Sequence, residues 1–178
     1  MKVGMTSLRP NELPGDFVET AVARHQGPLL RYASRLLGDV DLARDVVQDT
    51  FVKFMAQERE SVAGHEVEWL FTVCRHRALD ILRKEGRMRH FEEGETERLH
   101  APDLRPGEGM EREETRTLLL TLMDRLPARQ QELLRLKFLN GFSYKQISRI
   151  TALSVSNVGF LIHTAVTRLR REFAATPK

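Results

Sequence analysis

Apolar residues in this chain recur three and four positions apart over two stretches, which span residues 16–90 and 115–173. A period near 3.6 predicts amphipathic helices, and neither stretch contains an alternating, β-branched run bounded by hairpin turns. The stretch between them, residues 91–114, has no apolar period and contains two prolines and three glycines among its acidic residues. The pattern predicts an all-α protein with two small helical domains joined by a flexible acidic linker.

The first domain is expected to begin with two helices. Apolar residues at 17–22 mark the first one, and Gly27-Pro28 interrupts or kinks it because proline lacks an amide donor. Apolar residues at 29–37 continue as the second helix, which Gly38 ends at a position that favours glycine.

A third helix follows, for which either Asp39 or Asp41 is the expected N-terminal cap. Its predicted apolar stripe consists of Leu42, Val46, Val47, Phe51, Phe54 and Met55. Its opposite, polar face carries Asp41, Asp45, Gln48, Asp49 and Lys53.

A fourth helix is predicted from about Glu66 to Lys84. The residues expected to be buried are Trp69, Leu70, Val73, Leu79 and Leu82. The residues expected to face outward are basic: Arg75, His76, Arg77, Arg83 and Lys84, followed by Arg87 and Arg89.

The second domain contains a helix-turn-helix pattern. One helix is expected to end before Pro127 and another to run over residues 131–139. The segment Ser143-Tyr-Lys-Gln146 is a capping box that opens a short helix. Either Ser154 or Ser156 caps a longer final helix. Two helices joined by a tight turn, the second one longer, are typical of DNA-binding proteins. The apolar residues of the final helix are Val158, Ile162, Ala165 and Leu169.

Composition narrows the class of protein. A single cysteine in 178 residues cannot form an internal disulfide, which excludes a cross-linked secreted scaffold. No apolar stretch approaches the ~20 residues needed to cross a bilayer. The first fifteen residues have no apolar region of the kind found in signal peptides. The expectation is a soluble cytosolic protein.

Charge is distributed unevenly along the chain although its net value is only +3. Residues 91–114 contain nine acidic and three basic side chains, whereas residues 115–178 contain eleven basic and three acidic ones. Segregation of this kind indicates a polyanionic partner for the second domain.

The motifs of the two domains resemble those of one family, the extracytoplasmic-function (ECF) group of sigma-70 factors. The segments Ala43-Arg-Asp-Val-Val-Gln-Asp-Thr-Phe51 and Trp69-Leu-Phe-Thr-Val73 resemble sigma region 2. The segments Leu126-Pro-Ala-Arg-Gln-Gln-Glu-Leu-Leu134 and Leu153-Ser-Val-Ser-Asn-Val158 resemble sigma region 4. The resemblance implies an N-terminal extension at 1–15, region 2 at 16–90, the acidic linker at 91–114 and region 4 at 115–178.

The family implies a bacterial transcription initiation subunit that binds core RNA polymerase, directs it to promoter DNA and helps to open the duplex. The expected partners are the β′ coiled coil and β flap of the polymerase, the −10 and −35 promoter elements and an anti-sigma factor, which in many members is anchored in the membrane. No catalytic residue, metal, cofactor or small-molecule substrate is implied. The residues expected to bind the polymerase are Asp45, Gln48, Asp49 and Lys53.

The resemblance also assigns two sets of DNA-binding residues. The −10 element is expected to contact Trp69, Arg75, His76, Arg77, Arg83, Lys84 and Arg87, with residues 58–66 forming a loop that receives a flipped base. The −35 element is expected to contact Ser143, Lys145, Arg149, Ser154, Ser156, Asn157, Phe160, Thr164 and Arg168.

The chain departs from the family pattern in its recognition helix. Most ECF factors carry basic residues where this chain has Gly159, Leu161, Thr164 and Val166. Phe160 lies off the apolar stripe and is expected to face outward. These departures predict that −35 recognition depends on backbone contacts and DNA shape, with Phe160 contacting a thymine methyl or a protein partner. A further departure is His76, where the family commonly has asparagine, so the preferred −10 base can differ.

Three other functions fit the sequence less well. A Cys74/His76 nucleophile is disfavoured because residues two apart on a helix point to different faces, which makes Cys74 a core residue. A metal site is disfavoured because the six histidines and one cysteine have no ligand spacing. A stand-alone helix-turn-helix regulator would account for the second domain but not for the acidic stripe at 45–51 or the basic helix that begins near Trp69.

Overall fold

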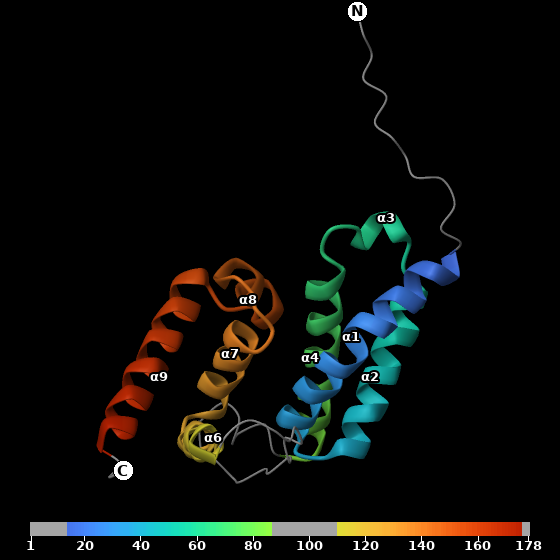
Figure 1. Ribbon diagram of the computed structural model, residues 1–178. Coiled ribbons are helices and arrows are strands. Elements are labelled where there is room, and N and C mark those ends of the chain that lie inside the picture. The colour runs from blue at the N-terminus through green and yellow to red at the C-terminus, as the bar shows by residue number, and fades with distance from the viewer. Residues whose placement is uncertain (1–13, 87–109, 176–178) are drawn as a thin grey trace, which may run out of the picture.

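The computed structural model describes residues 14–86 and 110–175, and the regular structure in these ranges is entirely helical. The all-α expectation is therefore confirmed. Figure 1 shows two groups of helices side by side. The first group contains α1 (Pro14–Leu37), α2 (Val40–Met55), the short α3 (Arg59–Val62) and α4 (Glu66–Lys84), and the second contains α6 (Met110–Met123), α7 (Ala128–Phe138), α8 (Tyr144–Thr151) and α9 (Val155–Ala175).

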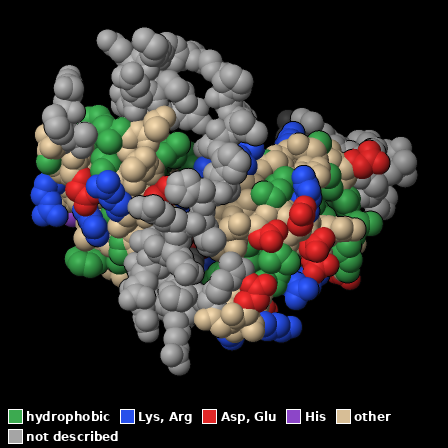
Figure 2. Space-filling model, turned by 90° about the horizontal axis from the view of Figure 1, so that it is seen from below, with side chains coloured by type: hydrophobic (Ala, Val, Ile, Leu, Met, Phe, Trp, Pro, Cys, Tyr) green, Lys and Arg blue, Asp and Glu red, His purple; other side chains and the backbone are tan. Residues whose placement is uncertain are grey.

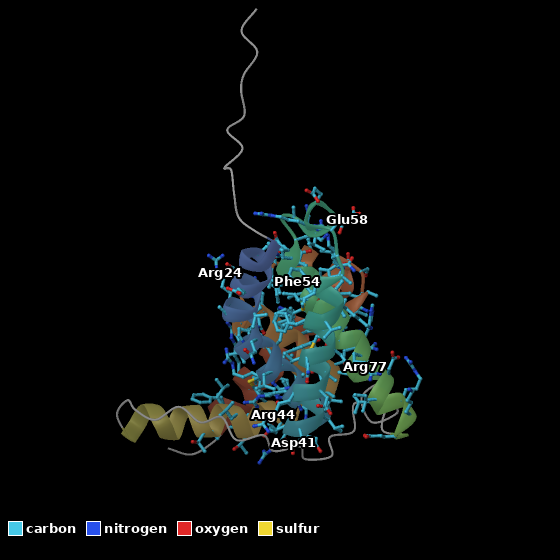
Figure 3. The ribbon with its side chains drawn as sticks, turned by 90° about the vertical axis from the view of Figure 1, so that its right-hand side faces the viewer. Arg24, Asp41, Arg44, Phe54, Glu58 and Arg77 are labelled. Carbon is cyan, nitrogen blue, oxygen red and sulfur yellow. The ribbon has the colours of Figure 1, made fainter. Side chains whose placement is uncertain are left out.

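The first group is a bundle of three long helices around an aromatic core. α1, α2 and α4 contact one another pairwise, and α3 lies at one end of them (Figure 1). Phe54 of α2 is 1% exposed, and its ring centroid lies 5.2 Å from that of Phe17 and 5.6 Å from that of Trp69. Figure 3 shows Phe54 inside the bundle. These contacts join all three helices because Phe17 belongs to α1 and Trp69 to α4.

Side-chain caps fix where three helices begin. The Asp39 carboxylate accepts hydrogen bonds from the N–H groups of Asp41 and Leu42 at 2.8 and 3.0 Å, and so caps α2. The capping box of α8 is complete: Ser143 Oγ accepts from the Gln146 N–H at 3.3 Å, and Gln146 Oε1 accepts from the Ser143 N–H at 2.9 Å. Before α9, Ser154 Oγ accepts from the Asn157 N–H at 3.2 Å. The predicted caps are confirmed. Of the two candidates for each of α2 and α9, Asp39 and Ser154 are the caps.

Two expectations for the first group are wrong: a separate second helix after Gly27-Pro28, and the burial of Met55. α1 runs without interruption through Pro28, although proline cannot donate the hydrogen bond of an interior helical residue. The fully buried Leu29 and Ala33 follow directly, so packing against α2 and α4 offsets the missing bond. Met55, expected in the apolar stripe, is 65% exposed. It lies one helical step, about 100°, from Phe54 and on the side away from the core.

A third difference concerns the segment between the domains. α6 begins at Met110, five residues inside the segment expected to be a linker. The remaining expectations for this segment, and those for the N-terminal extension up to residue 13, lie outside the described residues.

α8 and α9 form the expected helix-turn-helix. The two helices are bent by 105° at a break that contains Ala152, whose φ of 59° is left-handed. Val158, Ile162 and Ala165 of α9 are buried, as the spacing predicted. Among the described residues no single helix is long and apolar enough to span a membrane, and α8 with α9 meets that criterion only as this bent pair.

Cys74 is expected to resist thiol reagents as long as the chain is folded. Its side chain is fully buried on α4, and burial raises the pKa of the thiol from 9.0 to about 12, with a hydrogen bond to Thr50 opposing the change slightly. Only the thiolate reacts, so alkylation at pH 8 should be at least about a hundredfold slower in buffer than in denaturant. A mass-spectrometric time course with iodoacetamide measures both rates, and comparable rates would contradict burial of this thiol.

The same shift predicts a pH dependence of stability. The folded-state pKa lies above the unfolded one, so the thiol's contribution is fully present below about pH 9 and is lost as the pH rises toward 12. The free energy of unfolding of a Cys74→Ala variant should therefore fall less steeply over this range than that of the unchanged chain.

Candidate nucleic-acid interface

One face of α2 presents polar groups to solvent. Asp45 and Gln48 are exposed, and Lys53 is exposed one turn further along the helix. Asp49 is half-exposed and accepts a hydrogen bond from Nε of Arg77 on α4 at 3.0 Å. Figure 3 shows Arg77 on the flank of the bundle. The structure thus brings the four predicted residues of α2 onto one accessible face.

This face has an apolar part that sequence analysis missed. Val52 is 59% exposed and Met55 is 65% exposed, beside the polar residues of the same helix. Val52 lies three and four positions after Asp49 and Gln48, which is the spacing of side chains on a common helix face. The spacing of Val52 from these two residues could have identified it as part of the exposed face. The apolar pattern of the helix, in contrast, predicts that Met55 is buried.

The loop between α2 and α4 is closed by its own hydrogen bonds. Val62 anchors it and is 1% exposed, while the residues around it are exposed. The Gly64 N–H donates to Glu66 Oε1 at 3.1 Å, and a ring nitrogen of His65 lies 3.2 Å from the Ala63 carbonyl oxygen. The guanidinium of Arg59 lies 5.2 Å from the centre of the Phe17 ring, which ties α3 to α1.

The predicted DNA-binding residues of α4 differ in how far they are exposed to solvent. His76, Arg83 and Lys84 are exposed, and Arg83 forms an ion pair with Asp80 at 2.7 Å. Trp69 is half-buried, with its ring against Phe54. Arg77 is half-exposed, and Arg87 lies outside the described residues.

Arg75 was expected to face outward, and this orientation is wrong. Its side chain is buried between the two groups of helices, where Nε donates to Glu132 Oε1 at 2.8 Å and Nη2 donates to Oε2 at 3.3 Å. The Tyr32 hydroxyl donates to the same carboxylate at 2.5 Å. Sequence spacing along α4 could not reveal this burial because Glu132 lies 57 residues away.

The surroundings of Arg75 and Tyr32 hold each of these two groups in one protonation state. Burial alone would lower the pKa of Arg75, but the Glu132 carboxylate and its hydrogen bonds more than offset burial, and the pKa is raised. Burial first, and the negative charge of Glu132 second, hold the pKa of Tyr32 well above its ordinary value. Arg75 therefore stays charged and Tyr32 stays a hydrogen-bond donor at neutral pH.

Most of the residues predicted to contact the −35 element lie on the exposed face of α9. Ser156, Asn157 and Thr164 are exposed, and Phe160 is 65% exposed, which confirms its predicted outward orientation. Arg168 follows Thr164 by one turn and forms an ion pair with Glu172 at 2.8 Å. Lys145 and Arg149 are exposed on α8, where Arg149 Nη1 also donates to Glu68 Oε2 of α4 at 2.9 Å. Ser143 and Ser154 serve as caps of α8 and α9.

Two further residues share this face of α9. His163 and Thr167 are exposed at three and seven positions after Phe160. The same helical period that placed Phe160 outward could have identified them.

Gly159 lies under an aromatic ring. A Cβ atom at this position would stand 3.5 Å from Cε2 of Tyr144, which is an ordinary van der Waals distance. The Lys137 ammonium lies 5.3 Å from the centre of the same Tyr144 ring. The glycine is therefore not required by a close approach of α8 to α9.

A Gly159→Ala variant is accordingly expected to be more stable, by about 0.5–1 kcal/mol, because alanine has the higher helix propensity and its Cβ fits. Gly64→Ala is the contrasting variant. Its φ of +78° is left-handed, so an added Cβ should cost about 1–2 kcal/mol although the space is open. Urea unfolding of both variants measures these changes, and equal signs would contradict this account.

Acidic and basic side chains are distributed unevenly over the two groups of helices. Seen from below, Figure 2 shows Asp and Glu side chains gathered over the first group, on the right, and Lys and Arg prominent over the second, on the left. Within residues 14–86 and 110–175, no three His, Cys, Asp or Glu side chains come together as a metal site would require.

Comparison with known protein families gives two matches in the order expected. The model of Sigma-70 region 2 matches residues 21–88, and that of Sigma-70, region 4 matches residues 116–169.

Individual relatives share most of their length with this chain. It is 30% identical over 150 residues to the ECF RNA polymerase sigma factor SigL of Mycobacterium tuberculosis, covering 82% of each chain. It is 32% identical over 148 residues to the ECF RNA polymerase sigma factor EcfG of Rhodopseudomonas palustris, covering 80% of this chain and 77% of that protein. The fold is similar to that of the sigma factor RpoE from Bartonella quintana, solved in complex with the anti-sigma factor NepR. The TM-score is 0.64 at 23% identity, over 91% of this chain and 99% of that one.

Proposed function

Since the chain belongs to the ECF group of sigma-70 RNA polymerase sigma factors, we propose that it binds core RNA polymerase and directs it to promoters with −10 and −35 elements. Members of the family are non-catalytic transcription initiation factors. The observation that carries the proposal is the combination, in one chain, of an exposed acid-and-amide face on α2 with an exposed helix-turn-helix at α8 and α9.

The polymerase is proposed to bind the α2 face. Asp45, Gln48 and Asp49 offer carboxylate and amide oxygens that accept hydrogen bonds from arginine side chains of the β′ coiled coil. Val52, missed by sequence analysis, supplies apolar surface beside them. An interface with an apolar centre and charged neighbours gives both affinity and orientation.

The −10 element is proposed to bind along α4 and the loop at residues 58–66. The exposed His76, Arg83 and Lys84 can neutralise phosphates or donate to bases, and Arg87 continues the set outside the described residues. The Trp69 ring packs against Phe54, so we expect it to support the DNA-binding surface of α4 rather than to stack on a base.

The −35 element is proposed to lie against α9. Ser156 and Asn157 stand at the N-terminal end of the helix, where hydroxyl, amide and backbone groups reach phosphates or base edges. The central positions of the face carry Phe160 and Thr164 in place of cations, so backbone contacts and DNA shape carry a larger share of recognition.

Phe160→Ala tests this part of the proposal. Loss of an exposed ring that contacts a thymine methyl or a protein partner should weaken promoter binding or partner binding at least about fivefold, while stability changes little because the ring is 65% exposed. DNase footprinting and a polymerase pull-down measure the two interactions. Phe173→Ala, which removes another exposed phenyl ring near the end of α9, is the control. If Phe160→Ala left both interactions unchanged, the assigned role would be wrong.

The domain bounds and the regulation are further parts of the proposal. We assign region 2 to residues 16–90 and region 4 to 115–178, with 91–114 connecting them.

Family members act in the cytoplasm, and we propose an anti-sigma factor that covers both domains and can hold this chain at the membrane. Capture from separated membrane and soluble fractions on the immobilised chain tests this, and a captured protein that fails to compete with core polymerase would contradict it.

Assembly of the complex tests the polymerase-binding part of the proposal. The purified chain and core RNA polymerase, run together on a size-exclusion column, should elute as one species. A stand-alone helix-turn-helix regulator would elute separately from the polymerase and would bind duplex DNA without it.

A further inference from the structure

The exposed face of α9 continues onto α8 through one aromatic ring. Gly159 lies three residues after Ser156 and four before His163, so it shares their side of the helix. The Tyr144 ring of α8 lies against this glycine, because a Cβ there would stand 3.5 Å from Cε2 and 3.7 Å from Cδ2. Tyr144 is itself 39% exposed. The ring therefore forms part of the solvent-facing surface along one edge of α9.

A lysine from a third helix lies over the same ring. The ammonium group of Lys137, in the last turn of α7, is 5.3 Å from the centre of the Tyr144 ring. It also donates a hydrogen bond to the carbonyl oxygen of Phe142 at 3.3 Å. Lys137 is half-buried. These two contacts hold a charge in place on a side chain that is otherwise flexible.

The Lys137 ammonium keeps donors for a ligand. An ammonium group has three N–H donors, and the Phe142 carbonyl accepts from only one of them. Within residues 14–86 and 110–175, no carboxylate forms an ion pair with Lys137. A positioned lysine without a carboxylate partner is suited to bind an anion, and phosphate is an anion that lysine commonly binds in proteins.

The place of Lys137 beside α9 fits a DNA phosphate better than a base. A helix about 10–12 Å across fills a major groove about 12 Å wide. Side chains at the centre of the exposed face, such as Phe160, then meet base edges, whereas groups at the flank meet the sugar-phosphate backbone. Lys137 belongs to α7 and stands at the flank, on the edge of α9 that Gly159 occupies.

The first half of α9 has no cation of its own. Residues 155–167 contain neither lysine nor arginine, and the first basic residue of the helix is Arg168. Binding to duplex DNA depends on neutralised phosphates, so a helix of this composition needs cations from neighbouring elements. Lys137 is in a position to provide one.

We infer that Lys137, held over the Tyr144 ring, is a phosphate-binding residue of the −35 interface and supplies beside Gly159 the cation that the first half of α9 lacks. The inference rests on the proposed sigma function. Tyr144 is a positioning residue, because its ring acts on the DNA through the lysine that it holds.

Five variants separate this role from a purely structural one. Lys137→Met removes the charge and keeps an unbranched side chain. Tyr144→Leu removes the ring, and Tyr144→Phe keeps it. Lys137→Met combined with Gly159→Lys returns a cation to the same edge from α9 itself. Arg24→Met removes an exposed cation of α1, outside the proposed interfaces, and is the matched control. Thermal unfolding followed by circular dichroism checks that each variant is folded.

The measurement is binding of the assembled holoenzyme to duplex fragments that carry promoters mapped with the unchanged chain. Fluorescence anisotropy over a series of KCl concentrations gives the affinity and its salt dependence. Lys137→Met should weaken binding at least about threefold at low salt, equally on every promoter, and lower the salt slope by about 1, because one phosphate contact is lost. Tyr144→Leu should reduce both quantities in the same direction. Tyr144→Phe and Arg24→Met should leave both unchanged.

The double variant should recover the affinity and the salt slope of the unchanged chain. Unchanged affinity and slope in Lys137→Met would overturn the inference, and a loss confined to one promoter would show a base contact instead. A double variant as weak as Lys137→Met would contradict the placement of the charge beside Gly159. If the unchanged chain gave core polymerase no promoter binding at all, the proposed sigma function would fail, not only the role of Lys137.

Discussion

Asp49→Arg is expected to weaken assembly with core RNA polymerase strongly while the chain stays folded. The substitution places a cation among carboxylate and amide groups proposed to bind arginines, so a charge-assisted hydrogen bond is replaced by repulsion. Loss of such a pair costs about 2–5 kcal/mol, or roughly 30- to 5000-fold in affinity. Size-exclusion chromatography and fluorescence anisotropy of the labelled chain measure the loss.

The fold should survive because the existing ion pair is near solvent. Asp49 and Arg77 are 48% and 39% exposed, and ion pairs at such positions contribute about 0–1 kcal/mol. Glu19→Arg, an exposed charge reversal on α1, is the matched control and should bind polymerase normally. Unchanged affinity of Asp49→Arg would show that α2 does not present the polymerase-binding face.

Phe54→Ala is expected to be the most destabilising of these substitutions, by about 3–5 kcal/mol. The side chain is 1% exposed and its ring contacts both Phe17 and Trp69, so truncation leaves a cavity and removes two aromatic pairs. A small domain has only about 5–15 kcal/mol of total stability. Thermal unfolding followed by circular dichroism should show Tm lowered by at least about 10 °C.

The control for Phe54→Ala lies two residues away on the same helix. Val52→Ala truncates a side chain that is 59% exposed, and its free energy of unfolding should change by less than about 0.5 kcal/mol. If Phe54→Ala cost under 1 kcal/mol, the aromatic core that joins α1, α2 and α4 would not be the main source of stability in this bundle.

Local features of the fold could be predicted because their causes lie within a few residues. The Ser143 hydroxyl and the Gln146 amide bond to backbone groups three residues away, so a short sequence window contains the whole capping box. The period of Val158, Ile162 and Ala165 likewise defines the buried stripe of α9, and with it the exposed side on which Phe160 lies.

Features that depend on distant partners could not be predicted in this way. Arg75 lies among basic residues and reads as exposed, but Glu132 and Tyr32 compensate its charge from other helices. Pro28 reads as a break, but packing of the next turn of α1 against α2 and α4 keeps the helix continuous. In both cases tertiary contacts overrode a local rule.

The measurement that tests the central claim most directly is transcription from genomic DNA fragments by core RNA polymerase, with and without the purified chain, followed by mapping of the start sites. If the chain is a sigma factor, new start sites should appear only when it is present, preceded by two shared elements near −10 and −35 at a constant spacing. Identical start sites with and without the chain would contradict the account.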